Sequence, residues 1–477
     1  MNFLLKAGGD VNVVLAFKDT EEVNKGSDLF KFLKEKKLFK GSEGEVYTHL
    51  SKDESFVFLG LGDEKKLNFQ SLRKSFFLLG EKAQKLNITS LSISVPRFGD
   101  LCYTTTIKSL AEGLIQSQYS FEKFKSDKKE KTFLEDIYLE VLEEKREKVE
   151  AGLKEIETIM EGVFITRDLV NEPAMNMYPE TLAKAAVDNL SSLGIDVKVY
   201  GQKEIEEMDM IAFLAVSKGS EKEPKFIVMN YKGDPSSEEK LALVGKGLTY
   251  DSGGYSIKTA EGMATMHSDM AGSASVIGAL YSIAKAGIKK NVIGIVAACE
   301  NMISGGAYKT GDIIGSMSGK TIEVGNTDAE GRITLADALW YAATVEKANK
   351  IVDLATLTGA CVVALGSINT GAITNDESLM DDIREAAKIS GEPVWELPHD
   401  EEYKELFKSH FADLKNTGGR WAGAITAGMF LQEFVNDTPW VHLDIAGTSF
   451  ISGSRGYLPK GATGVPVKTL FNLVKNM

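Results

Sequence analysis

The sequence is short of the residues on which several common enzyme classes depend. Only five of its 477 residues are histidine and three are cysteine. No histidine stands in a His-Glu-x-x-His pattern, by which zincin proteases bind zinc, and no Gly-x-Ser-x-Gly pattern marks an α/β-hydrolase nucleophile. We therefore expect neither zincin nor α/β-hydrolase chemistry.

Disulfides, secretion signals and membrane spans are also not indicated. Cys102, Cys299 and Cys361 are odd in number, far apart and set among apolar residues, which predicts buried free thiols. The N-terminus has no basic start followed by a long apolar region and a cleavage site. No apolar run approaches the ~20 residues that span a bilayer. We expect a cytoplasmic protein with no membrane partner.

An excess of basic residues is lacking as well. The chain has 55 Lys and Arg against 68 Asp and Glu, a formal net charge of -13. Because nucleic acids and anionic membranes bind clustered Lys and Arg, nucleic acid is not an expected partner. The length exceeds the roughly 250–300 residues that one hydrophobic core usually serves, so we expect two domains.

The N-terminal third shows the rhythm of a small α/β domain. Short β-like runs at 11–17, 56–62 and 91–96 alternate with helix-like segments such as 69–86. Residues 121–160 are densely charged, with apolar residues at helical spacing from about 133, which favours a solvated helical connector over a partner-binding arm. We place the domains at residues 1–155 and 156–477.

The second domain has longer and more apolar β-like runs. Such strands are usually buried on both faces of a sheet that helices cover. The fold class predicted is α/β: a smaller N-terminal α/β domain plus a larger C-terminal α/β catalytic domain with a mixed central sheet covered by helices. In such sheets the ligand site lies beyond the carboxyl ends of the strands. The runs are 195–200, 225–231, 241–245, 291–299, 350–357 and 440–447.

Four carboxylates in this domain lie among small residues, which let ligands approach closely. One such residue alone is more often a helix cap or a loop acid, but four together favour a metal site. With so little His or Cys, a set of carboxylates suits Mg, Mn or Zn and is large enough to bridge two ions. The four are Asp251, Asp269, Asp328 and Glu330.

Five segments of the second domain resemble the M17 leucyl aminopeptidase family, also called cytosol aminopeptidases. The resemblance runs from about residue 166 to the C-terminus, while the first 150 residues match in layout more than in motif. The most specific segment is "NTDAEGR" at 326–332. The five segments are 244–258, 268–274, 300–314, 326–342 and 353–366.

The resemblance implies a metal-dependent aminopeptidase that releases N-terminal residues, preferably leucine or other hydrophobic ones, by means of a hydroxide that bridges two metal ions. Zn and Mn are the expected ions, with Mg and Co as further possibilities. By resemblance Lys258 stabilises the developing oxyanion, and Arg332 holds a bicarbonate ion that acts as general base. The metal ligands implied are Lys246, Asp251, Asp269, Asp328 and Glu330, with Asp251 and Glu330 bridging the ions.

Strand alternation offers a local reason for two of these ligands. If the β-like run at 320–324 continues, Asp328 and Glu330 point in one direction, Ala329 faces away and Arg332 continues the register. On pattern alone, Lys246 and Lys258 are more typical of surface lysines. Their roles rest on the resemblance.

The resemblance also implies a substrate pocket and an oligomer. The pocket residues implied are Met266, Thr356, Leu357, Gly359 and Ala446. The expected partners are peptide substrates and further copies of the chain, as a homo-oligomer and by resemblance a hexamer.

The chain departs from the family pattern at three positions. His267 stands where most relatives have Lys or Arg, Ala271 replaces a Gly, and Tyr255 replaces an aliphatic residue. Two functions other than an aminopeptidase stay open. One is a DNA-binding or regulatory protein on the same scaffold, and the other is another two-metal hydrolase such as a phosphatase or amidase.

Overall fold

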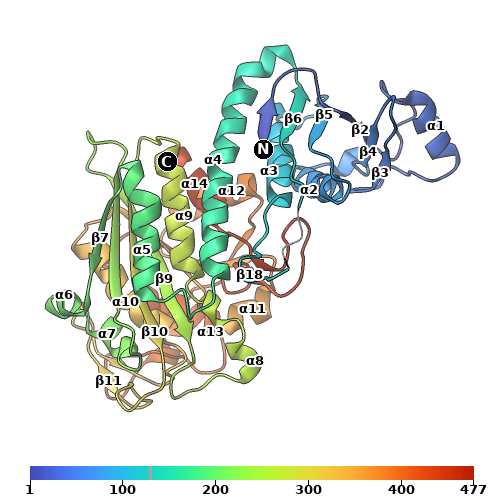
Figure 1. The fold of residues 1–477 in the computed structure, drawn as a ribbon. Coiled ribbons are helices and arrows are strands. Elements are labelled where there is room, and N and C mark those ends of the chain that lie inside the picture. Colours follow the sequence, from blue (N-terminus) through green and yellow to red (C-terminus); the bar gives the residue numbers. More distant parts are fainter. Residues whose placement is uncertain (128–130) are drawn as a thin grey trace. The chain divides into compact units, whose positions relative to one another are not determined.

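The computed structural model describes residues 1–127 and 131–477. The chain forms two compact units, one of Met1–Met160 with Ser454–Pro459 and one of Glu161–Gly453 with Lys460–Met477. Each unit has its own sheet and helices, so the predicted fold class is confirmed (Figure 1). The boundary that we place at residue 155 stays a prediction.

The first unit is built on a six-stranded sheet that is parallel except at one edge, where β3 pairs antiparallel with β4. The strands and the helix predicted from the sequence of this unit are confirmed. In sheet order the strands are β1 (Asn2–Leu4), β6 (Asp136–Glu140), β5 (Ser90–Ser94), β2 (Val11–Ala16), β4 (Phe56–Gly60) and β3 (Val46–His49). The helices are α1 (Ser27–Glu35), α2 (Phe69–Lys85), α3 (Tyr103–Ser117) and the start of α4 (Arg146–Asn171).

The predicted helical connector is partly wrong. Its middle is strand β6, which pairs with β1 and β5, and the helix begins only at Arg146. Ile137 and Leu139 are fully buried between less buried neighbours, a period of two that belongs to a strand. Residues 128–130 of the connector lie outside the described residues.

The second unit is built on an eight-stranded mixed sheet, as predicted. Its centre is parallel, and antiparallel pairs occur between β14 and β17, β10 and β8, and β8 and β7. The sequence runs are confirmed as strands, whereas β14 and β15 were not predicted. In sheet order the strands are β15 (Val394–Glu396), β14 (Thr370–Thr374), β17 (Trp440–Asp444), β13 (Lys350–Ala355), β9 (Lys240–Asp251), β10 (Asn291–Asn301), β8 (Lys225–Lys232) and β7 (Asp196–Tyr200).

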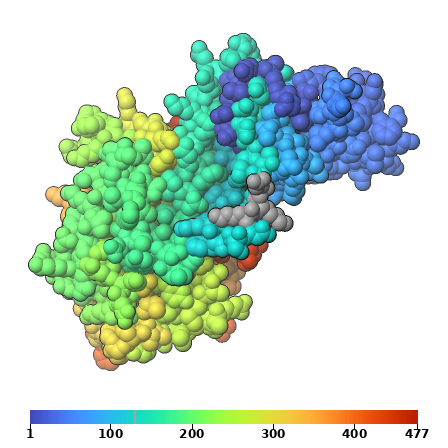
Figure 2. All heavy atoms as spheres, viewed as in Figure 1, coloured from blue at the N-terminus to red at the C-terminus, as the bar shows by residue number. Residues whose placement is uncertain are grey.

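Helices pack on both faces of this sheet. Ala242 and Val244 of β9 join the apolar core with α7, α10 and α13, while Gly245 lies against Ser273 of α9. In Figure 1, α5 and α9 lie in front of the strands, and Figure 2 shows side chains filling the space between these ribbons. The helices are α5 (Pro179–Leu190), α6 (Gln202–Glu207), α7 (Ile211–Ser217), α8 (Ala260–Met263), α9 (Ala271–Lys285), α10 (Gly331–Thr344), α11 (Gly359–Leu365), α12 (Glu377–Ser390), α13 (Gly423–Gln432) and α14 (Val467–Asn476).

Smaller elements complete the fold. The short strands are β11 (Ile313–Ile314), β12 (Ile322–Glu323), β16 (Leu414–Lys415), β18 (Phe450–Ile451) and β19 (Gly461–Ala462). The 3₁₀ helices are η1 (Glu64–Lys66), η2 (Glu143–Lys145), η3 (Ser191–Leu193), η4 (Met266–Ser268) and η5 (Glu401–Phe407).

Two expectations concern the whole chain. The three cysteines are free, as predicted, but Cys102, the residue before α3, is exposed rather than buried. Within the described part of the chain, no helix combines the length and apolarity that crossing a bilayer requires.

Candidate active site

Strand β9 supplies Lys246 from its interior and Asp251 from its last position. Five residues apart on a regular strand, their side chains would point to opposite faces of the sheet. The register with β10 shifts between Leu248 and Tyr250, so Thr249 is an extra residue on β9. A bulge of this kind reverses the alternation and turns both side chains toward one cluster of charges.

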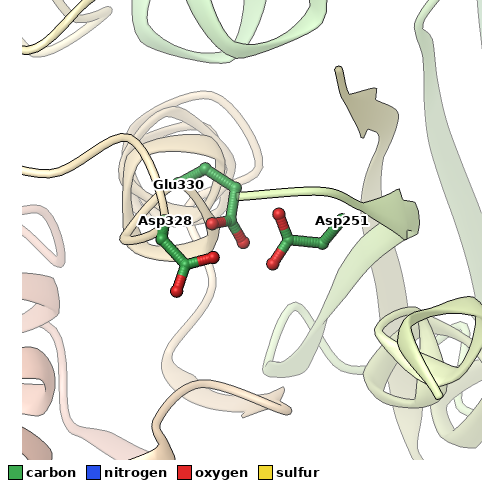
Figure 3. Close-up of side chains that lie close together, drawn as sticks. All are labelled: Asp251, Asp328 and Glu330. Carbon is green, nitrogen blue, oxygen red and sulfur yellow. The ribbon is translucent and has the colours of Figure 1, made fainter. Parts of the chain in front are cut away.

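Asp328 and Glu330 come from a loop and not from a strand, which corrects the alternation argument. Strand β12 ends at Glu323, α10 begins at Gly331, and Glu330 is the residue before the helix. Both carboxylates nevertheless reach the same place. Ligand atoms of these two residues and of Asp251 lie within 4.8 Å of one another (Figure 3).

The side chain of Asn416 holds this loop. Its Oδ1 accepts the backbone N–H of Gly325 at 2.8 Å, and its Nδ2 donates to the carbonyl of Asn326 at 2.7 Å. Asn416 therefore satisfies two polar backbone groups of a loop that lies beside buried charges. Asn416 itself is fully buried.

Lys246 joins two of the carboxylates. Its Nζ lies 2.8 Å from Asp269 Oδ2 and 3.0 Å from Glu330 Oε1, and it donates to the carbonyl of Thr356 at 3.1 Å. Thr356 in turn donates its hydroxyl to Asp269 Oδ1 at 2.7 Å. The end of β13 and the turn before α9 therefore meet at this lysine.

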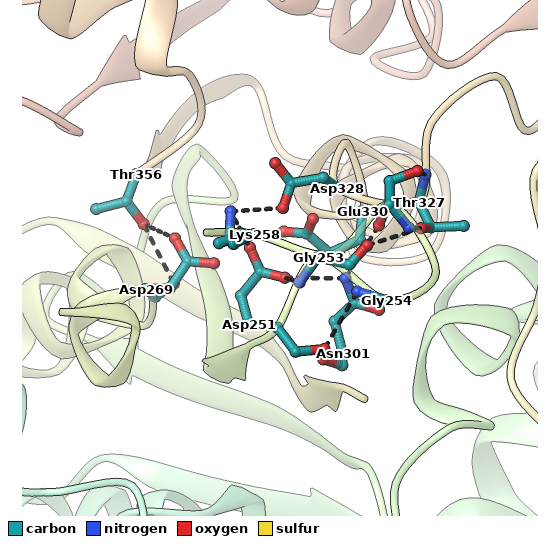
Figure 4. A network of polar contacts seen from close by, with 12 residues as sticks. Asp251, Gly253, Gly254, Lys258, Asp269, Asn301, Thr327, Asp328, Glu330 and Thr356 are labelled. Carbon is teal, nitrogen blue, oxygen red and sulfur yellow. Dashed lines mark hydrogen bonds and ion pairs between the residues drawn. The ribbon is translucent and has the colours of Figure 1, made fainter. Parts of the chain in front are cut away.

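Lys258 joins the other two carboxylates. Its Nζ lies 2.8 Å from Asp251 Oδ2 and 2.6 Å from Asp328 Oδ1 (Figure 4). The second oxygen of Asp251 accepts the backbone N–H of Gly253 at 2.8 Å and the side-chain amide of Asn301 at 2.9 Å. All five predicted metal ligands and Lys258 thus lie in one network.

Burial and crowding shift the pKa values of this network. Burial, with repulsion from Asp251, raises the pKa of Glu330 to about 8, and burial raises the pKa of Asp269 to about 6 against the attraction of Lys246. Burial by itself lowers the pKa of Lys246, but the surrounding carboxylates outweigh it and raise that pKa above its usual value. The negative charges outnumber the ammonium groups around them.

The donor set fits divalent metal ions. Among the residues that the structure describes, no hydrogen-bond donor reaches the buried Oε2 of Glu330. An acceptor oxygen buried in this way is destabilising unless a donor or a cation satisfies it. Crowded carboxylate oxygens are the ligands that Mg, Mn and Zn accept in proteins.

Arg332 is the second residue of α10, so the prediction that it continues a strand register is wrong. It is 7% exposed, and its guanidinium donates to the carbonyl of Asn416 at 2.8 Å. Burial lowers its pKa to about 10, while the carboxylates of Glu330 and Asp444 act in the opposite direction. A cation therefore lies directly beside the acidic cluster.

The predicted pocket residues fall into three segments. Leu357 and Ala446 both donate their backbone N–H to Asp444 Oδ1, at 3.2 and 3.1 Å, which ties the end of β13 to the end of β17. Gly359 is the first residue of α11, and Met266 is the first residue of η4, just before Asp269. Their role in substrate binding stays a prediction.

The structure shows what surrounds each of the three departures. Ala271 is fully buried without conflict, because the tight approach of α9 to the sheet is at Gly272, where a Cβ would lie 2.1 Å from the carbonyl of Leu354. The ring of His267 packs edge-on against Phe450, with centroids 5.4 Å apart. Tyr255 donates its hydroxyl to the carbonyl of Ser304 at 2.9 Å.

The sequence reasoning missed several supporting residues. Asn301 and Asp444 are polar residues that end the buried strands β10 and β17, at the sheet edge where a site was expected. Their position after an apolar run was the signal that was available. Asn416 has no such signal, since it follows only the two-residue strand β16.

Family models and solved structures match the chain along nearly its whole length. The model described as "Cytosol aminopeptidase family, catalytic domain" matches residues 164–471, and the model of that family's N-terminal domain matches residues 14–128. The solved structure of the bottromycin maturation enzyme BotP in complex with Mn is 28% identical, with a TM-score of 0.89, over 98% of this chain and 99% of that one.

Curated relatives agree. A probable cytosol aminopeptidase of Clostridium tetani is 60% identical over 100% of this chain and 99% of its own length. Another, of Treponema denticola, is 48% identical over 99% of both chains. The chain therefore belongs to the cytosol aminopeptidase family, M17, and is a metal-dependent aminopeptidase.

Proposed function

We propose that the protein is a dinuclear leucyl aminopeptidase, which removes an N-terminal leucine or another hydrophobic residue from peptides. The single observation that carries this proposal is the network in which Lys246 and Lys258 each contact two carboxylates of one cluster. A cluster that dense, with an unsatisfied Glu330 oxygen, has the composition of a site for two divalent ions.

The ions in this proposal are Zn or Mn, with Mg or Co as alternatives. When bound they supply Lewis-acid catalysis at the scissile carbonyl. The Mn complex of BotP supports the choice of Mn. The residues that would hold them are Lys246, Asp251, Asp269, Asp328 and Glu330.

Lys258 is the proposed oxyanion-stabilising residue. Its side chain is 17% exposed, whereas that of Lys246 is 3% exposed, so Lys258 is the lysine that substrate can reach. An ammonium group near a reacting carbonyl stabilises the negative charge that develops on its oxygen, which is often the largest catalytic contribution. Its contacts with Asp251 and Asp328 keep it charged and aimed at the cluster.

Arg332 is proposed to hold a bicarbonate ion that accepts a proton during hydrolysis. A guanidinium presents paired N–H donors that match the geometry of a small planar oxyanion. The proposed side-chain pocket for leucine consists of Met266, Thr356, Leu357, Gly359 and Ala446. Met suits such a pocket because its flexible thioether adapts to aliphatic side chains.

We also propose that the enzyme works in the cytoplasm as a homohexamer. The names of the curated relatives support the compartment. The comparisons give no support to a DNA-binding or regulatory protein, or to another class of two-metal hydrolase.

The test is hydrolysis of leucine p-nitroanilide by metal-free protein and by protein reconstituted with Mn or Zn. We expect activity only with metal. We also expect Glu330→Gln to lower activity by at least about 100-fold, because the Glu330 carboxylate is central to the cluster. Glu238→Gln is the control, since Glu238 is exposed and precedes the opposite end of β9.

The same assay separates the alternatives. A reconstituted protein that is inactive on leucine and other aminoacyl arylamides but hydrolyses aryl phosphates would be another two-metal hydrolase. Full activity after exhaustive metal removal would contradict the proposal outright.

A further inference from the structure

Asn301 ends strand β10 beside Asp251, which ends the neighbouring parallel strand β9. The two residues are register partners, and both are buried. Without the bulge on β9, Asn301 would lie opposite Tyr250, and the bulge moves Asp251 into that place. The bulge therefore sets a side-chain amide directly beside one of the proposed metal ligands.

The amide of Asn301 links the end of β9 to the loop before α10. Its Nδ2 donates to Asp251 Oδ1 at 2.9 Å and to the carbonyl of Thr327 at 3.0 Å (Figure 4). A carboxylate and a backbone carbonyl only accept hydrogen bonds, so they fix the amide with its nitrogen toward them. Thr327 immediately precedes Asp328, and one side chain thus connects two segments that carry proposed ligands.

Neither of these two acceptors depends on Asn301 alone. Asp251 Oδ1 also accepts the backbone N–H of Gly253 at 2.8 Å, and the carbonyl of Thr327 also accepts the hydroxyl of Tyr308 at 2.8 Å. If the amide were absent, each oxygen would keep one donor, so no buried acceptor would be left unsatisfied. The fold therefore does not require the hydrogen bonds of Asn301.

The other end of the amide is unfavourable for stability. Asn301 Oδ1 is buried and, over residues 1–127 and 131–477, no donor reaches it. It lies against Gly254, where a Cβ would be 3.0 Å from it. A buried oxygen without a donor is destabilising, so an apolar side chain would serve stability better at this position. An amide placed here is explained by the site and not by the fold.

The hydrogen bonds to Oδ1 determine which oxygen of Asp251 can meet a cation. Each carboxylate oxygen has about two lone-pair sites, and the N–H of Gly253 and the amide of Asn301 occupy both sites of Oδ1. Oδ2 is then the oxygen left for a cation, and it already lies 2.8 Å from the ammonium group of Lys258.

We propose that Asn301 is a positioning residue, which holds the Asp251 carboxylate so that only Oδ2 faces the metal ions and ties it to the loop before α10. A ligand that is oriented in advance binds metal more tightly, because a neighbour rather than the metal fixes its direction. The inference rests on the proposed function, because it assumes that Asp251 and Asp328 are metal ligands.

The experiment compares Mn binding by Asn301→Leu and Tyr308→Phe in the full chain. Asn301→Leu nearly keeps the side-chain volume and removes both hydrogen bonds. Tyr308→Phe removes one hydrogen bond from the same carbonyl of Thr327 and leaves both donors of Asp251 Oδ1 in place. Metal-free protein is titrated with Mn, and free Mn is measured by its electron paramagnetic resonance signal. We expect Mn affinity to fall about 10–100-fold in Asn301→Leu and less than about 3-fold in Tyr308→Phe.

Thermal unfolding of the metal-free protein distinguishes positioning from folding. Asn301→Leu removes an unsatisfied buried oxygen, which offsets the lost hydrogen bonds, so its midpoint should lie within about 3 °C of the wild type. A lower midpoint with unchanged Mn affinity would show a structural role and overturn the inference. Equal losses of Mn affinity in Asn301→Leu and Tyr308→Phe would overturn it too. If Asn301→Leu does not fold, Asn301→Ala decides by the same comparison.

Glu330→Gln separates this inference from the proposed function. If Glu330→Gln binds Mn weakly while Asn301→Leu binds it as the wild type does, the carboxylate cluster is the metal site and the inference about Asn301 is wrong. If Glu330→Gln binds Mn as tightly as the wild type, the failure lies in the proposed function.

Discussion

Gly331 decides how closely Lys246 can approach the carboxylates. A Cβ at position 331 would lie 2.6 Å from Lys246 Nζ and 2.5 Å from its Cε, closer than real atoms come. The tip of a lysine is usually free to move aside, but this one is held by Asp269, Glu330 and the carbonyl of Thr356. The observed position of Lys246 therefore requires glycine at position 331.

We accordingly expect Gly331→Ala to lower kcat/KM about 10–100-fold and to weaken metal binding, because a small displacement of a ligand disturbs the whole geometry. Alanine is the better helix former, so the thermal midpoint should change far less than activity. Steady-state kinetics measures the change in kcat/KM, and metal titration measures the change in metal binding. Gly305→Ala is the matched control, since no atom lies within 4 Å of a Cβ there, and equal kinetics in both variants would contradict the argument.

At the scale of elements, α10 secures a neighbouring helix through one buried acid. The first N–H groups of any helix lack partners within it. Asp337 of α10 is fully buried, and its Oδ2 accepts the backbone N–H of Phe213 in the first turn of α7 at 2.9 Å. Its Oδ1 accepts the N–H of Met317 at 2.8 Å. One side chain thus joins two segments more than 100 residues apart in sequence from one another.

Asp337→Asn should destabilise the protein by roughly 1–3 kcal/mol, because an amide has one acceptor oxygen for two buried N–H groups. Burial raises the pKa of Asp337 to about 7, against hydrogen bonds from Phe213 and Met317 that lower it. The folded state therefore binds more protons than the unfolded state between about pH 4 and 7, and stability falls as pH rises through that window.

Denaturant titrations at pH 5 and pH 8 measure this effect. The stability advantage of the wild type over Asp337→Asn should be larger at pH 5 than at pH 8. A larger advantage at pH 8 than at pH 5 would show that the Asp337 carboxylate is ionised in the folded protein across this pH range. Asp400→Asn is a suitable control, because Asp400 is exposed and its side chain makes no capping hydrogen bond to the 3₁₀ helix that follows it.

At the scale of the molecule, the chain is acidic and its surface carries apolar side chains on and after α11. Val363 is 89% exposed and Ile368 is 58% exposed. Exposed apolar side chains close together in sequence are typical of surfaces that contact another chain. They support the proposed assembly of several copies.

Light scattering during size-exclusion chromatography is the corresponding measurement. We expect six times the monomer mass, and a smaller mass after Val363→Asp, which places a charge in the proposed interface. A monomer mass for the wild type at micromolar concentration would refute the hexamer.

The strands that carry the site were predictable because burial on both faces leaves a local mark. The runs at 241–245 and 291–299 lie within β9 and β10, and the run at 350–357 contains β13, because long apolar strands are buried on both faces of a sheet that helices cover. The prediction of a helix from about residue 133 was wrong at its start. Apolar residues there recur at helical spacing, but the same segment contains a short run of period two, which pairs in the sheet as β6.

The sequence by itself determined the α/β class, the set of carboxylates and lysines, and the family resemblance, because each of these is written in adjacent residues. Tertiary structure alone decided how they act together. The bulge at Thr249 exists only relative to β10, and the partner of Asn301 lies 50 residues away in Asp251. Register and long-range pairing are properties of two strands in contact, so no pattern within either strand contains them.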